Sequence, residues 1–100
     1  MTLDSKKMQA NAQEAANFLK LLSNPTRLFL LCQLIQEARC VSDLEARLEI
    51  SQSALSQHLA KLKEQGLVKA DRQGQNIYYS IADKKVLQVL ELLYKLYCET

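Results

Sequence analysis

Residues 42–66 read SDLEARLEISQSALSQHLAKLKEQG and contain two helical patterns separated by a short break. A short helix is expected over 43–48 and a longer amphipathic helix over 52–65. Three leucines lie at helical spacing on the inward side of the longer helix, namely Leu55, Leu59 and Leu62. Gly66 follows, at the place where helices commonly end in a left-handed residue. Two helices joined by a three-residue turn form a helix-turn-helix.

Two serines are expected to start these helices. Ser42 and Glu45 have the spacing of a capping box, in which the serine caps the helix and the glutamate bonds back to it. Ser51 stands directly before the longer helix and belongs to the residue types preferred at the N-cap.

Two further helices are predicted before this unit. Apolar side chains recur at helical spacing along residues 8–22. Asn24 and Pro25 then mark the start of a second helix, because asparagine is a favoured N-cap and proline suits the first helical position. The inward face of this second helix is expected to carry Leu28, Leu31, Cys32 and Ile35.

The pattern changes its period after Gly66. Apolar residues alternate along 67–81 on both sides of a polar segment at 71–75, which predicts a small β-hairpin with its turn in that segment. A last helix is expected from a cap at Asp83 to about Cys98. The predicted fold class is mainly α with a small β-hairpin wing, the winged helix-turn-helix.

The last helix indicates how the chain assembles. Ten of the thirteen residues over 86–98 are apolar, and the polar ones form one narrow stripe of Gln88, Glu91 and Lys95. A helix that is apolar nearly all round must be buried on most sides. We therefore expect a homodimer in which a second subunit covers this helix; the alternative is a helix buried inside one chain.

Length and composition limit the remaining possibilities. The 100 residues suit one domain over 1–100, and two glycines and one proline are too few for a turn-rich β sandwich. The longest apolar run, at 28–32, is far shorter than the roughly 20 residues of a membrane span. The N-terminal residues lack the apolar segment of a secretory signal, so we expect a cytoplasmic protein with no membrane partner.

Catalytic groups are sparse in the sequence. A single histidine, no nucleophile–base pair and no glycine-rich loop leave no catalytic constellation, so we expect neither an enzyme nor a cofactor. The net charge of +2 permits an acidic partner without requiring one.

A winged helix-turn-helix reads DNA with its second helix, whose N-terminal half meets base edges in the major groove. Six side chains of this helix are candidate DNA contacts: Gln52, Ser53, Ser56, Gln57, His58 and Lys61. Three more lie where the wing would reach the backbone or the minor groove: Arg72, Gln73 and Gln75. Amides and hydroxyls can read base edges, and lysine can bind phosphate. The alternative is the polar outer side of an ordinary surface helix.

Several strings in the chain together resemble the ArsR/SmtB family of repressors. They are NPTRL at 24–28, CVSDL at 40–44, SQSALSQHL at 51–59, GLV at 66–68 and YYSI at 78–81. The resemblance implies a homodimer, held by the first and last helices, that binds a palindromic operator until an inducer releases it. It also assigns DNA reading to Ser53, Ser56, Gln57 and His58.

The chain departs from the metal-sensing members of that family. Their CVCDL core has a second cysteine where this chain has Ser42, and their last helix holds histidine ligands that residues 84–100 lack. Zinc normally takes four ligands dominated by cysteine and histidine. We therefore expect no metal site; a metal- or metalloid-responsive repressor remains the alternative.

Cys32 and Cys98 occupy positions similar to those of the BigR-, SqrR-, YgaV- and HlyU-like dithiol subgroup. That resemblance implies a switch in which reactive sulfur species or an oxidant link the two thiols. Buried cysteines with no sensing role are one alternative. A non-inducible DNA-binding anti-silencer, or a winged helix used for protein contact, is another. Cys40 falls outside the pair and receives no role.

Overall fold

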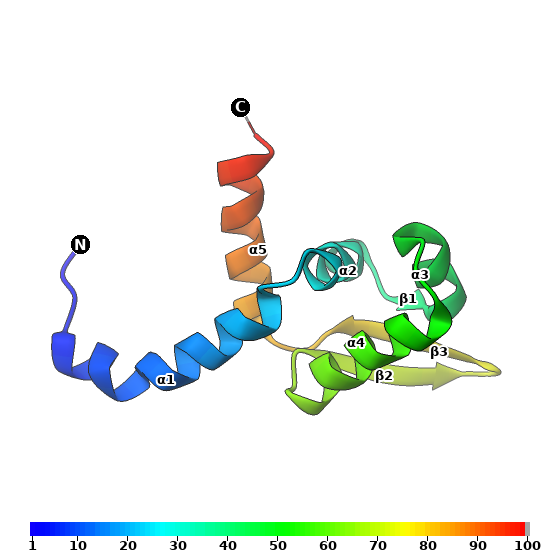
Figure 1. Ribbon diagram of the computed structural model, residues 1–100, viewed down its shortest axis with the longest axis horizontal. Helices are drawn as coiled ribbons and strands as arrows, with labels where there is room; N and C mark the ends of the chain where they lie inside the picture. The colour runs from blue at the N-terminus through cyan, green and yellow to red at the C-terminus, as the bar shows by residue number, and fades with distance from the viewer. Residues whose placement is uncertain (100) are drawn as a thin grey trace.

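The computed structural model describes residues 1–99 and shows a mainly helical chain with a small antiparallel sheet (Figure 1). The elements in chain order are α1 (Ser5–Leu22), α2 (Pro25–Gln36), β1 (Arg39–Cys40), α3 (Val41–Leu48), α4 (Gln52–Glu64), β2 (Val68–Gln73), β3 (Asn76–Ile81) and α5 (Lys84–Tyr97). Helices α1 and α5 extend in different directions from a body formed by α2, α3, α4 and the sheet (Figure 1). The predicted fold class is confirmed.

Three predicted helix caps are present. Asn24 Oδ1 accepts a hydrogen bond from the Arg27 amide at 3.1 Å, and Ser51 Oγ accepts one from the Ala54 amide at 3.1 Å. Asp83 caps α5 in the same way. Each cap satisfies an amide that the first turn of a helix leaves without an intrahelical partner.

Helix α4 ends just before Gly66, as the sequence predicted. Gly66 has a φ of +79°, its amide donates to Lys63 O at 3.0 Å, and the Leu67 amide donates to Leu62 O at 2.9 Å. This pair of bonds is a Schellman motif, which needs a left-handed residue at the glycine position. The chain therefore turns sharply from α4 into β2.

Two predicted helix starts were wrong. Helix α1 begins at Ser5, three residues before the expected start, because Asp4 caps it. Helix α3 begins at Val41 with Cys40 as its N-cap, so the predicted capping box of Ser42 does not form. The reason is that β1 runs directly into α3, which places Ser42 inside the first turn.

The sheet contains a short strand that the sequence analysis missed. Its order is β1-β3-β2, and β1 pairs antiparallel with β3 through Arg39 opposite Tyr79 and Cys40 opposite Tyr78. Strands β2 and β3 pair from Val68–Ile81 to Gln73–Asn76. The hairpin turn is therefore only residues 74–75, narrower than predicted, with Gly74 at a φ of +64°.

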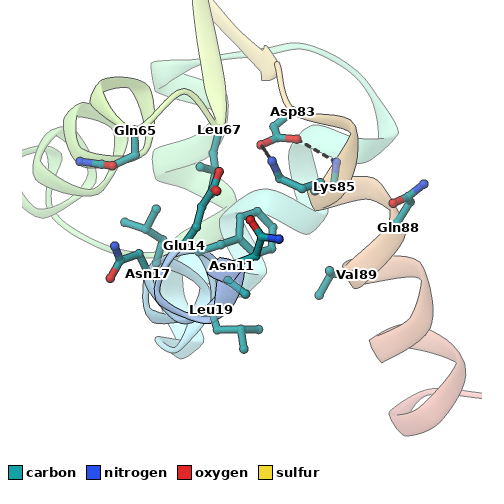
Figure 2. Close-up of a pocket in the computed structure, with 13 residues that line it drawn as sticks. Asn11, Glu14, Asn17, Leu19, Gln65, Leu67, Asp83, Lys85, Gln88 and Val89 are labelled. Carbon is teal, nitrogen blue, oxygen red and sulfur yellow. Dashed lines mark hydrogen bonds and ion pairs between the residues drawn. The ribbon is translucent and has the colours of Figure 1, made fainter. Parts of the chain in front are cut away.

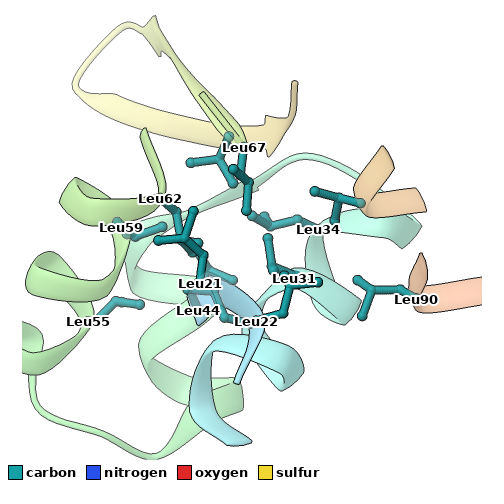
Figure 3. Close-up of a cluster of buried hydrophobic side chains, with 13 residues drawn as sticks. Leu21, Leu22, Leu31, Leu34, Leu44, Leu55, Leu59, Leu62, Leu67 and Leu90 are labelled. Atoms are coloured by element: carbon teal, nitrogen blue, oxygen red, sulfur yellow. The ribbon is translucent and has the colours of Figure 1, made fainter. Parts of the chain in front are cut away.

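The core is a cluster of leucines drawn from all the helices, with Leu67, Val68 and Val86 (Figure 3). Leu55, Leu59 and Leu62 are at most 2% exposed, as predicted. The inward face of α2 was predicted in part: Leu31 is buried and Leu28 packs against the core, but Leu30 and Leu34 fill the rest of that face. Cys32 and Ile35 are exposed in the single chain. Helix α2 is apolar on most sides, so periodicity did not identify the side that packs.

A buried arginine ties α2 to α3. Arg39 is 6% exposed; its Nε donates to Gln33 O at 2.9 Å and its Nη1 to Asp43 Oδ2 at 3.1 Å. Arg47 Nη1 donates to Gln33 Oε1 at 3.1 Å. The two guanidinium groups hold the pKa of the Asp43 carboxyl below its ordinary value. Gln33 is thus a shared anchor for the helix-turn-helix.

Candidate nucleic-acid interface and thiol pair

The side of α4 opposite its three buried leucines faces solvent. Five of the predicted contact residues are exposed there: Gln52, Ser53, Ser56, Gln57 and Lys61. Because Leu55 and Leu59 are fixed in the core, the side chains of Ser56 and Gln57 point outward between them. The result is an exposed row of hydroxyl and amide groups on a rigid helix.

His58 lies at the edge of this row rather than on it. The side chain is half-buried, and burial together with the Arg27 guanidinium lowers the pKa of its imidazole below the ordinary value. Both effects favour the neutral imidazole, which can donate or accept a hydrogen bond. Arg27 was not predicted as a site residue, although it is the only charged residue of α2.

The wing residues are exposed at the end of the β2–β3 hairpin, which projects from the body (Figure 1). Arg72 Nε donates to Gly74 O at 3.3 Å, and Gln73 Nε2 donates to Asp71 Oδ2 at 3.3 Å. Gln75 lies in the two-residue turn itself. The hairpin thus presents one guanidinium and two amides at its tip.

The two cysteines of the predicted pair come from different helices. Cys32 lies on α2, Cys98 is the C-cap of α5, and both are exposed free thiols. Partial burial raises the pKa of the Cys32 thiol, and the charge of Cys98 raises that pKa further. Helices α2 and α5 contact each other, so the two cysteines belong to neighbouring elements.

Cys40 has the opposite character. A hydrogen bond with Ser42 Oγ, at 3.3 Å from Cys40 Sγ, is the largest of the effects that lower the pKa of this thiol. A contact from the Asp43 backbone at the start of α3 lowers it further. Cys40 is thus the cysteine whose reactive thiolate is favoured.

Two features of residues 1–99 bear on other functions. No group of three or more histidine, cysteine, aspartate or glutamate side chains in that range is arranged to hold a metal ion. None of the helices there combines the length and the apolar content needed to cross a membrane.

A helix-turn-helix with an exposed polar second helix and an adjoining β-hairpin defines the class of winged helix-turn-helix DNA-binding proteins. Residues 24–70 match the family described as bacterial regulatory protein, arsR family. Over 97 residues the chain is 40% identical to the transcriptional activator HlyU of Vibrio cholerae, covering 97% of this chain and 90% of HlyU.

Solved structures agree with the sequence match. Reduced HlyU from Vibrio cholerae N16961 superposes with a TM-score of 0.88 at 41% identity, over 94% of this chain and 99% of that one. The transcriptional repressor BigR from Xylella fastidiosa superposes with a TM-score of 0.90 at 37% identity, over 98% of this chain and 100% of that one. The chain belongs to the arsR family of bacterial regulatory proteins and is a DNA-binding transcriptional regulator.

Proposed function

We propose that this chain is a homodimeric repressor that binds a palindromic operator and releases it when Cys32 and Cys98 become linked. The observation that carries the switch is that Cys32 lies on α2 and Cys98 at the end of α5, two helices that contact each other, and that both are exposed free thiols. The effect of Cys98 on the pKa of Cys32 agrees with this placement. A similar solved structure is that of reduced HlyU, a name that distinguishes a redox form of that protein. The inducer is then a reactive sulfur species or an oxidant.

Operator reading belongs to the exposed row of α4 together with the wing. Gln52, Ser53, Ser56 and Gln57 offer hydroxyls and amides to base edges, with His58 beside them. Lys61 and Arg72 supply positive charge for phosphates, and Gln73 and Gln75 extend the wing contact. Base contacts then give sequence preference, and the phosphate contacts give salt-dependent affinity.

Dimerisation accounts for the exposed apolar side chains of α5. Leu92 is 56% exposed, Leu96 is 64% exposed and Tyr97 is 79% exposed. Val89, Leu92 and Leu96 follow one another at helical spacing, so they share a face. Val89 also lines a cavity of about 740 Å³ between α1 and α5 (Figure 2). A second copy that contributes its own α1 and α5 would fill this space and cover the apolar face.

A persulfide can act as the two-electron oxidant that links the two thiols. The Cys98 thiolate attacks the outer sulfur of glutathione persulfide, and glutathione leaves as the thiol. The Cys32 thiolate then attacks the inner sulfur of the new Cys98 persulfide and expels hydrogen sulfide, which carries the two electrons away. Cys98 attacks first because it lies at the exposed end of α5, whereas partial burial raises the pKa of the Cys32 thiol and disfavours its thiolate. A second transferred sulfur would leave a longer bridge.

The link acts on the DNA-binding unit through α2. Gln33 follows Cys32 directly and is bonded by Arg39 and Arg47, which also hold Asp43 of α3. A bridge that pulls α2 towards the end of α5 therefore displaces the anchor of the helix-turn-helix. In a dimer this changes the spacing of the two α4 helices, on which binding to a palindrome depends.

Mass spectrometry tests the chemistry directly. The reduced full-length chain is treated with glutathione persulfide, hydrogen peroxide or As(III), and its peptides are mapped. The proposal expects a peptide that joins Cys32 to Cys98 after either sulfur or peroxide treatment, and Cys40 outside the bridge. A bridge that contains Cys40, or stable As(III) binding without any sulfur bridge, would favour a metalloid sensor instead.

A further inference from the structure

A second cavity, of about 420 Å³, lies where the end of α1, the start of α2 and the last turns of α4 meet. Three cationic side chains line it, one from each helix: Lys20, Arg27 and Lys61. Asn17, Ser23 and Gln65 add polar groups to its wall. No carboxylate among residues 1–99 lines the cavity, so its charge is uniformly positive.

Arg27 is the unusual member of this cluster. Its Nε and Nη1 atoms are buried and have no hydrogen-bond partner within the described part of the chain. None of the three cations forms an ion pair with a residue in the range 1–99. A buried guanidinium donor without a partner is costly, whereas an anion would satisfy it with strong charge-assisted bonds.

The surrounding backbone favours negative charge as well. Arg27 lies in the first turn of α2, where the helix dipole is positive, and this turn contains no acidic residue. Lys61 belongs to the exposed row of α4 and follows His58 by three positions. The cavity is therefore adjacent to the DNA-reading surface but distinct from the cysteine pair.

We propose that Lys20, Arg27 and Lys61 form a binding site for a phosphate-type oxyanion. Arg27 donates from its planar guanidinium, while the two flexible lysines close on the anion from α1 and α4. The oxyanion is either a backbone phosphate of bound DNA or a free ion, and both sources present the same tetrahedral oxygens. This site does not depend on the thiol switch.

The imidazole of His58 provides a direct readout of anion binding in the cavity. His58 feels the positive charge of Arg27, so an anion that neutralises the guanidinium raises the pKa of the imidazole. Sodium sulfate and inorganic phosphate are titrated into the reduced full-length chain, and the NMR signals of His58 and of the Arg27 Nε–H are followed. Sodium chloride at equal ionic strength is the control. The proposal expects saturable shifts with the oxyanions that chloride does not produce.

Variants test whether the oxyanion binds in this cavity. Arg27→Gln should weaken sulfate binding about tenfold or more, and Lys20→Gln about two- to fivefold. Lys6→Gln is the matched control, because Lys6 is an exposed lysine on the same helix but outside the cavity. Lys20 is exposed, so Lys20→Gln decides the question if Arg27→Gln does not fold.

Titration of random-sequence duplex DNA separates the two sources. If the site holds a DNA phosphate, Lys20→Gln weakens binding to every sequence and lowers the salt slope by about one. If it holds a free oxyanion, Lys20→Gln weakens sulfate binding about two- to fivefold and keeps its DNA affinity. No saturable oxyanion shift, combined with unchanged DNA affinity in Lys20→Gln, would overturn the proposal.

Discussion

Ser56 and Gln57 lie between two buried leucines of α4, and this position makes them the sharpest test of base reading. We predict that Ser56→Ala and Gln57→Ala each weaken binding to the specific operator by about 1–3 kcal/mol, because a base-edge contact is lost. Fluorescence anisotropy with a duplex selected from a random library measures the effect. An equal loss on random duplex would show that these side chains do not read sequence.

The thiols of Cys40 and Cys32 should titrate in a fixed order. Hydrogen bonding from Ser42 lowers the pKa of Cys40, whereas partial burial raises the pKa of Cys32. Since the thiolate is the nucleophile, iodoacetamide should modify Cys40 at a lower pH than Cys32. Peptide mass spectrometry across a pH series records both rates.

Ser42→Ala is the control for this order. It removes the bond that contributes most to the low pKa of Cys40, so the pH profile of Cys40 should move upward. The profile of Cys32 should stay in place. Faster alkylation of Cys32 than of Cys40 at neutral pH would contradict the assignment.

At the scale of the element, two serines at the start of α4 have separate roles. Ser51 caps α4, whereas the hydroxyl of Ser53 is exposed and forms no hydrogen bond with residues 1–99. Ser51→Ala should lower the free energy of unfolding by about 1 kcal/mol through loss of the cap. Ser53→Ala should leave stability unchanged and weaken operator binding. Urea denaturation and anisotropy measure the two effects, and a reversed pattern would refute this division.

The elements that the sequence predicted well are those with local chemical signals. Asn24-Pro25, Ser51 and Gly66 each act within one turn of helix, so their effect is visible without knowledge of tertiary contacts. Strand β1 has no such signal, because two residues become a strand only by pairing with β3, far along the chain. The start of α3 at Val41 depends on that pairing and was missed with it.

The candidate site also has features that the sequence could predict and features that it could not. The exposed row of α4 follows from the spacing of three leucines, so the sequence was enough to find it. The cavity of Lys20, Arg27 and Lys61 joins three helices, and no local spacing reveals it. The exposure of Cys32 was also missed, because α2 has apolar residues on both the packed and the open side.

At the scale of the whole molecule, the exposed face of α5 predicts a dimer. Leu96→Glu should shift the protein to monomer, because an unpaired carboxylate in an apolar interface is costly. Lys95→Glu is the control, since Lys95 stands in the polar stripe and pairs with Glu91. Leu90 is unsuitable because it is 4% exposed and lies in the core of its own chain. Sedimentation velocity that shows a folded wild-type monomer would contradict the dimer.

The central claim is that linking Cys32 to Cys98 releases DNA, and operator affinity before and after glutathione persulfide treatment tests it most directly. The reduced wild type, Cys32→Ser, Cys98→Ser and Cys40→Ser should all bind, because none of these cysteines lies on α4. After treatment, the wild type and Cys40→Ser should lose the operator, whereas Cys32→Ser and Cys98→Ser should keep it. Loss of the response in Cys40→Ser alone, or full release in Cys32→Ser and Cys98→Ser, would contradict the account.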